Sequence, residues 1–164
     1  MPCRSLPAVV LALLLAACAS PLSLKPGTPI QEARSTLGRP TAEIRLPDGG
    51  TRLQYSGQPN NQSVVNADFD AQGRLRIVEE MMTDESFARV RAGKDTQADV
   101  LRDFGRPAET FHYRLSNETA FMYRYLTFGG FKAAMYISFD PAGVVKRTET
   151  GLDPWSIGGG NRDH

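Results

Sequence analysis

Leu37-Gly38-Arg39-Pro40 recurs as Phe104-Gly105-Arg106-Pro107, and the stretch Phe69-Asp70-Ala71-Gln72-Gly73 recurs as Phe139-Asp140-Pro141-Ala142-Gly143. The two pairs keep the same order along the chain and lie 67 and 70 residues apart. Two motifs in the same order, with alternating apolar and polar residues between them, indicate an internal repeat of about 70 residues. The sequence therefore predicts two copies of one small structural unit.

In both copies the pattern predicts a helix followed by four strands. The first helix has Thr28 as its N-cap and Pro29 at its first position, and Gly38 ends it. Gly93-Lys94-Asp95-Thr96 opens the second helix in the same way, and a short helix over 84–91 precedes it. Alternation predicts strands over 43–46, 51–56, 64–69 and 75–80, and over 110–115, 120–126, 133–139 and 144–150. Turn residues between the strands favour antiparallel neighbours, so we expect an α+β fold.

Alternation also assigns the side chains of each sheet to two faces. The face expected under the helices is apolar and carries Ile44, Leu46, Leu53, Tyr55, Val65, Ala67, Phe69, Leu75 and Ile77, then Phe111, Tyr113, Tyr123, Tyr125, Met135, Ile137, Phe139 and Val145. The opposite face is polar and carries Arg45, Arg52, Gln54, Asn66, Asp68 and Arg76, then His112, Arg114, Met122, Arg124, Tyr136, Ser138 and Lys146. Because an antiparallel sheet can leave one face in water, this face is either a solvated surface or a docking surface.

Residues 1–17 have the form of a bacterial export signal. One positive charge, Arg4, precedes an apolar run of about ten residues, which is too short for a bilayer because a spanning helix needs about 20. The run ends in Leu15-Ala16-Ala17-Cys18, which resembles the lipobox of bacterial lipoproteins, where small residues precede a cysteine that receives a diacylglycerol. The alternative is an ordinary secretory signal with an incidental cysteine.

Lipidation at Cys18 predicts a membrane-anchored protein without a transmembrane helix. Several acyl chains bind a bilayer stably, whereas a single myristoyl chain binds only marginally. Residue 19 is Ala, and the resemblance to enterobacterial lipoproteins, where Asp there retains a protein in the inner membrane, favours the periplasmic face of the outer membrane. Because Cys3 lies in the signal, we expect no thiol, disulfide or cysteine metal ligand in the folded body.

The composition excludes several classes of function. The chain has 164 residues with 19 Lys+Arg and 18 Asp+Glu, and its net charge of +1 gives no overall electrostatic footprint for nucleic acid. A hydrophobic fraction of 41% is too high for a disordered chain. The histidines are His112 and His164, and no zinc-binding, phosphate-binding or serine-hydrolase motif occurs. The sequence therefore predicts no enzyme, no metal and no cofactor.

Candidate partner-binding residues come from the polar face and from one loop. The members on the face are Arg52, Arg76, His112, Arg114, Arg124, Tyr136 and Lys146. Phe128 and Phe131 flank two glycines in an expected hairpin tip. Apolar side chains in such a loop indicate contact with a partner or a lipid, or packing against the first unit. Cys18 is the candidate lipidation site.

The segment from Gly27 to Pro40, GTPIQEARSTLGRP, lies between the lipobox cysteine and the small antiparallel strands. It resembles the signature of the BamE (SmpA/OmlA) family of outer-membrane lipoproteins, and residues 93–107 resemble the same signature with one extra residue. A duplicated unit of this kind is also similar to the beta-lactamase inhibitory protein, in which two units share a concave sheet that grips an enzyme. The resemblance implies two tandem helix-plus-antiparallel-sheet units, with helices packed on one sheet face.

The resemblance also implies a non-enzymatic role in envelope integrity or in outer-membrane protein assembly, through protein binding. The assembly factors usually have one unit, and their Gln-Gly-Asn-Tyr-Leu stretch has no counterpart around residues 21–26, so no docking residues are carried over. The second hypothesis is a periplasmic inhibitor or ligand-binding lipoprotein. The expected organisation is a signal peptide (1–17), a lipidated linker (18–26), a first unit (27–83), a second unit (84–152) and a flexible tail (153–164).

Overall fold

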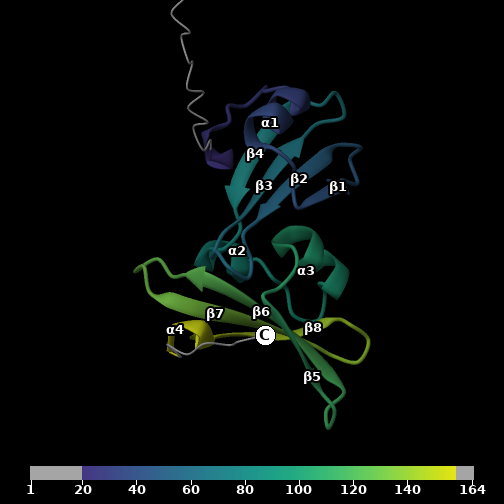
Figure 1. Ribbon diagram of the computed structural model, residues 1–164. Coiled ribbons are helices and arrows are strands. Elements are labelled where there is room, and N and C mark those ends of the chain that lie inside the picture. Colours follow the sequence, from purple (N-terminus) through teal and green to yellow (C-terminus); the bar gives the residue numbers. More distant parts are fainter. Residues whose placement is uncertain (1–19, 158–164) are drawn as a thin grey trace, which may run out of the picture.

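The computed structural model describes residues 20–157 (Figure 1). Two four-stranded antiparallel sheets and a few short helices make up this part of the chain, so the expected α+β class is confirmed. The predicted signal peptide, Cys18 and the end of the predicted tail, including His164, lie outside the described residues. Within residues 20–157, no helix is both long enough and apolar enough to cross a membrane.

Each sheet is a simple antiparallel meander. The first follows η1 (Pro21–Ser23) and α1 (Ile30–Leu37) and has the order β1 (Ala42–Arg45), β2 (Thr51–Ser56), β3 (Val64–Phe69), β4 (Leu75–Glu80). The second follows α2 (Asp84–Ala88) and α3 (Gln97–Phe104) and has the order β5 (Glu109–Tyr113), β6 (Glu118–Leu126), β7 (Lys132–Phe139), β8 (Val145–Leu152), with α4 (Pro154–Ile157) after it. We call residues 20–83 the first unit and residues 84–157 the second unit.

The same backbone hydrogen bonds recur in both units. The amide of Ile30, at the start of α1, donates to Gly73 O at 2.9 Å, and the amide of Gln97, at the start of α3, donates to Gly143 O at 2.9 Å. In each unit the bond joins the beginning of the helix to the turn between the third and fourth strands. The recurring sequence motifs thus occupy equivalent places in the fold.

An equivalent irregularity fixes which residues of the two sheets correspond. The pairing register shifts just before Phe69 in the first sheet and just before Phe139 in the second. Counting from these shifts, Arg52, Gln54, Asn66 and Asp68 correspond to Ala120, Met122, Tyr136 and Ser138. The same face of the repeated unit is therefore polar and hydrogen-bonding in the first copy, and less polar in the second.

The larger of two buried clusters contains residues from both units. The smaller cluster combines Ala33 of α1 with Leu53, Ala67, Phe69 and Leu75 of the first sheet. The larger combines Val64, Met81 and Met82 of the first unit with Phe87, Val100, Phe104, Phe121, Tyr123, Tyr125, Ala133, Met135, Ile137, Phe139 and Val145 of the second. Phe87 stacks on Phe104 with ring centroids 4.9 Å apart. Because one core spans both units, they form a single packed body.

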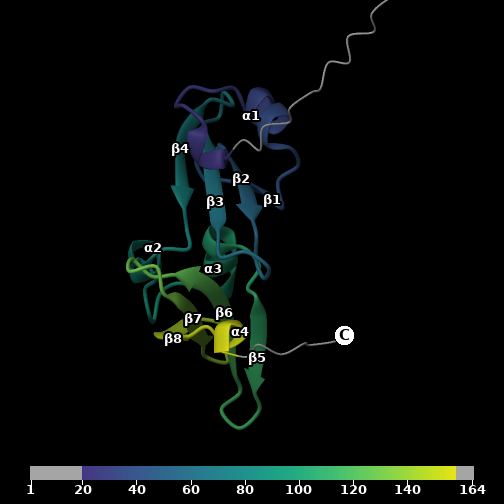
Figure 2. The ribbon, with the colours of Figure 1, turned by 60° about the vertical axis from the view of Figure 1, so that its left-hand side comes forward.

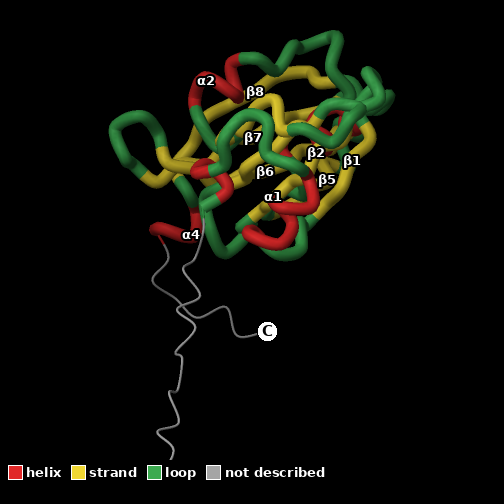
Figure 3. Tube along the Cα trace, turned by 90° about the horizontal axis from the view of Figure 1, so that it is seen from above, coloured by secondary structure: helices red, strands yellow, loops and turns green. Residues whose placement is uncertain are grey.

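The two sheets are separate, and α3 lies between them (Figures 1 and 2). α2 lies above the second sheet and α4 below it in the view of Figure 1, and the view from above shows the two helices well apart (Figure 3). This arrangement gives the second sheet one face that contributes to the shared core and one face that α4 partly covers.

The predicted faces of the edge strands β1 and β5 are wrong by one residue. Ile44 pairs with Arg52, and Phe111 pairs with Ala120, so Ile44, Phe111 and Tyr113 lie on the face predicted to be polar. His112, in contrast, lies on the other face. The turn sets this register, because Tyr113 pairs with Glu118 across a four-residue turn, whereas side-chain type alone does not.

The extra residue at each register shift explains why the sheet faces predicted for residues of β4 and β8 are partly wrong. Leu75 pairs with Phe69 and Ile77 pairs with Asp68, so Arg76 is the unpaired residue between them. Lys146 is the unpaired residue of β8 in the same way. Ile77 therefore lies on the polar face, where it is 48% exposed.

Both ends of the described chain are more ordered than the sequence predicts. Pro29, and not Thr28, occupies the N-cap of α1, whereas Thr96 caps α3 in a capping box with Asp99. Within the predicted linker, residues 21–23 form η1, and Leu24 packs on the smaller cluster. Within the predicted tail, Asp153 is fully buried and α4 follows it.

Two equivalent glycines provide a test of the contact between the units. Gly38 and Gly105 follow α1 and α3 with φ of +77° and +72°. A Cβ on Gly38 would meet nothing within 4 Å, whereas a Cβ on Gly105 would lie 2.7 Å from Gln54 Oε1. We expect Gly38→Ala to lower the free energy of unfolding by about 1–3 kcal/mol from backbone strain alone, because ψ near −160° at this φ is essentially restricted to glycine. Gly105→Ala should lower it by about 1–2 kcal/mol more, because it also displaces a buried amide.

Urea denaturation followed by circular dichroism measures both values. Equal losses would show that Gln54 does not hold the end of α3 in place.

Candidate functional site

The C-terminal end of α3 buries the polar face of the first sheet. Gln54 and Asn66, which were predicted to lie on an open face, are each 2% exposed. Gln54 Nε2 donates to Arg102 O at 3.3 Å, and Asn66 Nδ2 donates to Asp103 O at 2.8 Å. Since the last carbonyls of a helix have no partner inside the helix, these side chains supply the missing donors. The first unit therefore caps a helix of the second.

Arg52 completes this cap. Its Nε and Nη2 donate to the two carboxylate oxygens of Asp68 at 2.7 and 2.8 Å, and its Nη1 donates to Asp103 Oδ1 at 2.9 Å. The hydrogen bond with Asp68 raises the pKa of Arg52, although burial acts in the opposite direction. A cation near the C-terminus of a helix is also favoured by the helix dipole. Arg52 is thus an internal link between the units.

A second link lies where β6 extends beyond the end of β5. Gln58, in the loop between β2 and β3, donates from Nε2 to Arg124 O at 2.6 Å and accepts from Arg124 N at 3.3 Å. The side-chain amide pairs with both backbone groups of one β6 residue, as a neighbouring strand would. The first unit therefore covers part of a free sheet edge of the second.

Arg124 and Asp153 form a buried ion pair next to this link. Arg124 Nη2 lies 2.9 Å from Asp153 Oδ2, and the side chains are 11% and 0% exposed. Arg124 also donates to Pro59 O at 2.6 Å, and its guanidinium carbon lies 4.6 Å from the centre of the Trp155 ring. Gln62 Nε2 donates to Asp153 Oδ2 at 3.2 Å. This network ties α4 and β6 to the first unit.

The corresponding face of the second sheet carries aromatic side chains instead of a helix-capping set. We call Phe111, Tyr113, Tyr136 and Trp155 the aromatic face. The ring of Phe111 lies 6.5 Å from that of Tyr113 and 6.2 Å from that of Tyr136, between centroids. Tyr113 is 48% exposed, and Phe111, Tyr136 and Trp155 are partly exposed. The strand residues Ala120 and Met122 on this face are buried, so what the face exposes is its aromatic side chains.

Charged groups lie around the aromatic face. Trp155 Nε1 donates to Glu109 Oε1 at 2.9 Å. Burial raises the pKa of the Tyr136 phenol, and the Glu109 carboxylate acts in the same direction, so the phenol stays neutral. Glu118 forms ion pairs with Lys146 and with Arg147, and the hydrogen bond from Lys146 lowers the pKa of its carboxyl group. The combination of neutral aromatic groups and surrounding charges is typical of a protein-binding surface.

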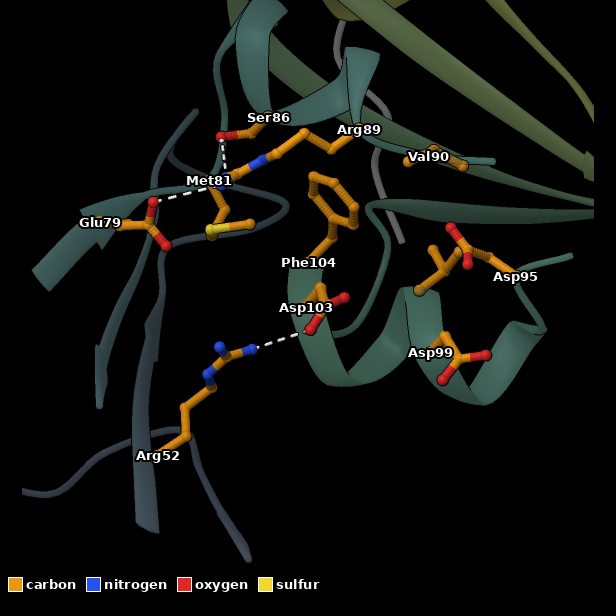
Figure 4. Close-up of a pocket in the computed structure, with 11 residues that line it drawn as sticks. Arg52, Glu79, Met81, Ser86, Arg89, Val90, Asp95, Asp99, Asp103 and Phe104 are labelled. Atoms are coloured by element: carbon orange, nitrogen blue, oxygen red, sulfur yellow. Dashed lines mark hydrogen bonds and ion pairs between the residues drawn. The ribbon is translucent and has the colours of Figure 1, made fainter. Parts of the chain in front are cut away.

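A pocket of about 210 Å³ lies beside α2 and α3, at the junction with the first unit (Figure 4). Val100 and Phe104 belong to its apolar lining, and Asp95, Asp99 and Asp103 to its acidic lining. Each carboxylate that lines the pocket forms an ion pair with an arginine: Asp103 with Arg52, Glu79 with Arg89, Asp95 with Arg91, and Asp99 with Arg102. Hydrogen bonds, first from the Thr96 side chain, lower the pKa of Asp99 to about 2. The carboxylates thus serve the helix cap and the ion pairs.

The structure does not bring the predicted partner-binding residues together in one site. Arg52 and Arg124 are buried links between the units, and Tyr136 lies on the aromatic face. Arg76 pairs with Asp48, Lys146 pairs with Glu118, and both are exposed. His112 lies on the far side of β5, where its Nδ1 is 3.2 Å from Thr119 Oγ1, and Arg114 lies in the β5–β6 turn.

The two phenylalanines of the β6–β7 loop pack against neither unit. Phe128 is 97% exposed and Phe131 is 75% exposed. Asp84 accepts a hydrogen bond from the backbone amide of Phe128, so only the backbone of this loop is tied to α2.

The sequence pattern predicted that Phe111 and Tyr113 lie on the apolar face under the helices, and that Asp153 and Trp155 belong to a flexible tail. A usable signal was the Arg114–Asn117 stretch, because a four-residue turn there sets Phe111 opposite Ala120. The role of Asp153 depends on contacts with Arg124 and Gln62, far away in the sequence, and no local pattern indicates it.

Within residues 20–157, no group of three or more His, Cys, Asp or Glu side chains is placed to hold a metal ion. No family model matches the chain, and no curated protein matches it. Among solved structures, a DUF4309 family protein (YjgB) from Bacillus subtilis has a TM-score of 0.31 and 10% sequence identity. That similarity covers 75% of this chain and 77% of the other, and nothing is inferred from so low a TM-score.

Because Asp153 forms a buried ion pair with Arg124, its replacement should destabilise the fold although it lies in the predicted tail. We expect Asp153→Ala to lower the free energy of unfolding by about 3–5 kcal/mol, because it leaves a buried guanidinium without its partner. Thermal unfolding followed by circular dichroism measures this change. The matched control is Glu43→Ala, which removes the exposed carboxylate partner of Arg34 and should change the midpoint little. A small effect at both positions would contradict the role given to Asp153.

Proposed function

We propose that this chain is a lipoprotein anchored to the periplasmic face of the outer membrane, and that it binds another envelope protein without catalysing a reaction. The observation that carries the proposal is the aromatic face. The repeated unit uses this face in the first copy to hold α3, whereas the second copy presents aromatic side chains there. A face that already docks a protein segment in one copy is a reasonable docking face in the other.

The residue types support protein binding. Tyr, Trp and Arg are enriched among the residues that dominate binding energy, and such residues cluster in the centre of an interface. Tyr113 and Phe111 offer large apolar area on short, stiff side chains, so little conformational entropy is lost on binding. The two rings lie side by side, with centroids 6.5 Å apart, and so form one apolar surface.

The resemblance to the BamE family supports the finer parts of the proposal. We infer that α1 packs on one face of the first sheet, and α2 and α3 on one face of the second, as in that family, because Ala33 of α1 and Phe87 and Phe104 of α2 and α3 are buried with strand residues. The lipobox and the Ala at position 19 support an anchor in the outer membrane. Together they support a role in envelope integrity or in outer-membrane protein assembly.

The lipid anchor has a direct test. We expect Cys18→Ser to abolish labelling by a radioactive fatty acid and to move the protein from the membrane fraction to the soluble periplasmic fraction, because the acyl chains attach to that sulfur. Cys3→Ser, in the predicted signal peptide, is the matched control and should change neither result. Unchanged fractionation of the Cys18 variant would rule out the anchor.

The aromatic face is tested by affinity purification from solubilised envelopes. We expect Phe111→Ser/Tyr113→Ser to reduce recovery of the bound envelope protein at least tenfold, since loss of a hot-spot side chain costs about 2 kcal/mol or more. The control is His112→Ser, which changes the residue between them on the opposite side of β5. Equal recovery with both variants contradicts the proposed face. Recovery of only a soluble periplasmic protein would favour the inhibitor hypothesis instead.

A further inference from the structure

The end of the β6–β7 hairpin is an apolar projection from the second sheet. We call Leu126, Phe128, Phe131 and Leu152 the hairpin tip; Leu152 lies beside it on β8. Phe128 is 97% exposed, Phe131 75%, Leu152 72% and Leu126 46%. The hairpin projects sideways beyond α2 and α4 of the second unit (Figures 1 and 3). Apolar side chains gathered at such a site mark contact with an apolar surface.

Four backbone amides in the loop at the hairpin tip are hydrogen-bonded within the protein. Thr127 N donates to Phe131 O at 3.0 Å, Gly130 N donates to Thr127 O at 2.8 Å, and Phe131 N donates to Thr127 Oγ1 at 3.2 Å. Phe128 N donates to Asp84 Oδ2 at 3.0 Å. Moving peptide groups away from water is costly unless they are already hydrogen-bonded. This loop can therefore enter an apolar medium without breaking those bonds.

The leucines of the hairpin tip favour a fluid medium over a protein groove. Leu126 pairs with Lys132, and Leu152 pairs with Ala133, so the two leucines lie on opposite faces of the sheet. A rigid partner surface would contact one of these faces. A lipid layer surrounds an inserted hairpin on all sides and would cover both.

In the view of Figure 1, η1 at the start of the described chain and the β6–β7 hairpin both lie toward the left of the molecule, η1 on the first unit and the hairpin on the second. Ser20, the first described residue, is two positions after Cys18, which is a span of at most about 7 Å. η1 follows at once, and its Leu22 is 53% exposed. An anchor at Cys18 would thus hold the folded body directly at the membrane surface, with no long linker between them.

We propose that the hairpin tip is a second membrane contact, which inserts Phe128 and Phe131 among the lipid headgroups of the leaflet that holds Cys18. This inference rests on the lipid anchor of the proposed function. Lys132 and Asp84 lie next to the rings and limit the depth of insertion, since charged groups stay at headgroup level. The anchor keeps the hairpin tip near the lipid, so a weak contact is sufficient to orient the body.

The test uses the mature chain with Cys18→Ser, so that no acyl chain contributes. We expect this protein to sediment with vesicles of phosphatidylethanolamine and phosphatidylglycerol when lipid is in large excess, since the contact is weak without the anchor. Phe128→Ser/Phe131→Ser should lower the bound fraction at constant lipid at least tenfold, because two apolar rings no longer leave water. Leu115→Ser is the matched control: Leu115 is fully exposed in the β5–β6 turn, at the far end of the molecule, and its loss should change nothing.

A site-specific probe reports the insertion itself. The mature Cys18→Ser chain has no other cysteine, so Phe128→Cys can be labelled with an environment-sensitive fluorophore, and Leu115→Cys can serve as control. The label at 128 should brighten on vesicles and be quenched by brominated lipid, and the label at 115 should do neither.

The proposal would be overturned if the Cys18→Ser chain did not bind vesicles, or if its binding survived the loss of both phenylalanines. It would also be overturned if Phe128→Ser/Phe131→Ser lost the envelope protein recovered by affinity purification but bound vesicles as before. Each of these outcomes leaves the fractionation of Cys18→Ser and the recovery with the aromatic-face variants unchanged, so the two proposals fail separately.

Discussion

The capping of α3 by the first sheet is the contact on which the arrangement of the two units depends. The side chains of Arg52, Gln54 and Asn66 satisfy carbonyl groups that a helix cannot satisfy itself. Without them, the end of α3 and the polar face would each be buried with unpaired groups. The contact therefore fixes where the second unit sits, and it explains why polar residues in strands of the first unit are almost fully buried.

Because of this contact, the same sheet face has a different environment in the two copies of the repeated unit. In the first copy the face opposite the small core is buried by α3 of the second copy, whereas in the second copy α4 covers part of the same face. The buried pair of Arg124 and Asp153 holds α4 at one side of that face, so Trp155 joins the aromatic residues of the strands. Polar side chains are therefore buried on this face in the first copy, and aromatic side chains are partly exposed on it in the second.

Much of the fold could be predicted because its signals are local. Repeated turn motifs located eight strands, and helix-stop signals located α1 and α3 to within a residue or two. The candidate site could not be predicted, because it depends on long-range contacts. The alternating pattern correctly predicted that Arg52 and Gln54 lie on the same face of the first sheet. Only the position of α3 shows that this face is buried. In β5, the preference to bury Phe111 and Tyr113 suggested the wrong face, and the length of the turn decided the register.

The differences between corresponding residues also limit how molecules can associate. A repeat whose polar face holds the next unit's helix could extend head to tail without end, because each added unit would bring a new face. Here the last face carries Ala120 and Met122 where the first has Arg52 and Gln54, so two of the three side chains that cap α3 have no polar counterpart. Head-to-tail polymerisation through the contact that joins the two halves of the chain is therefore disfavoured.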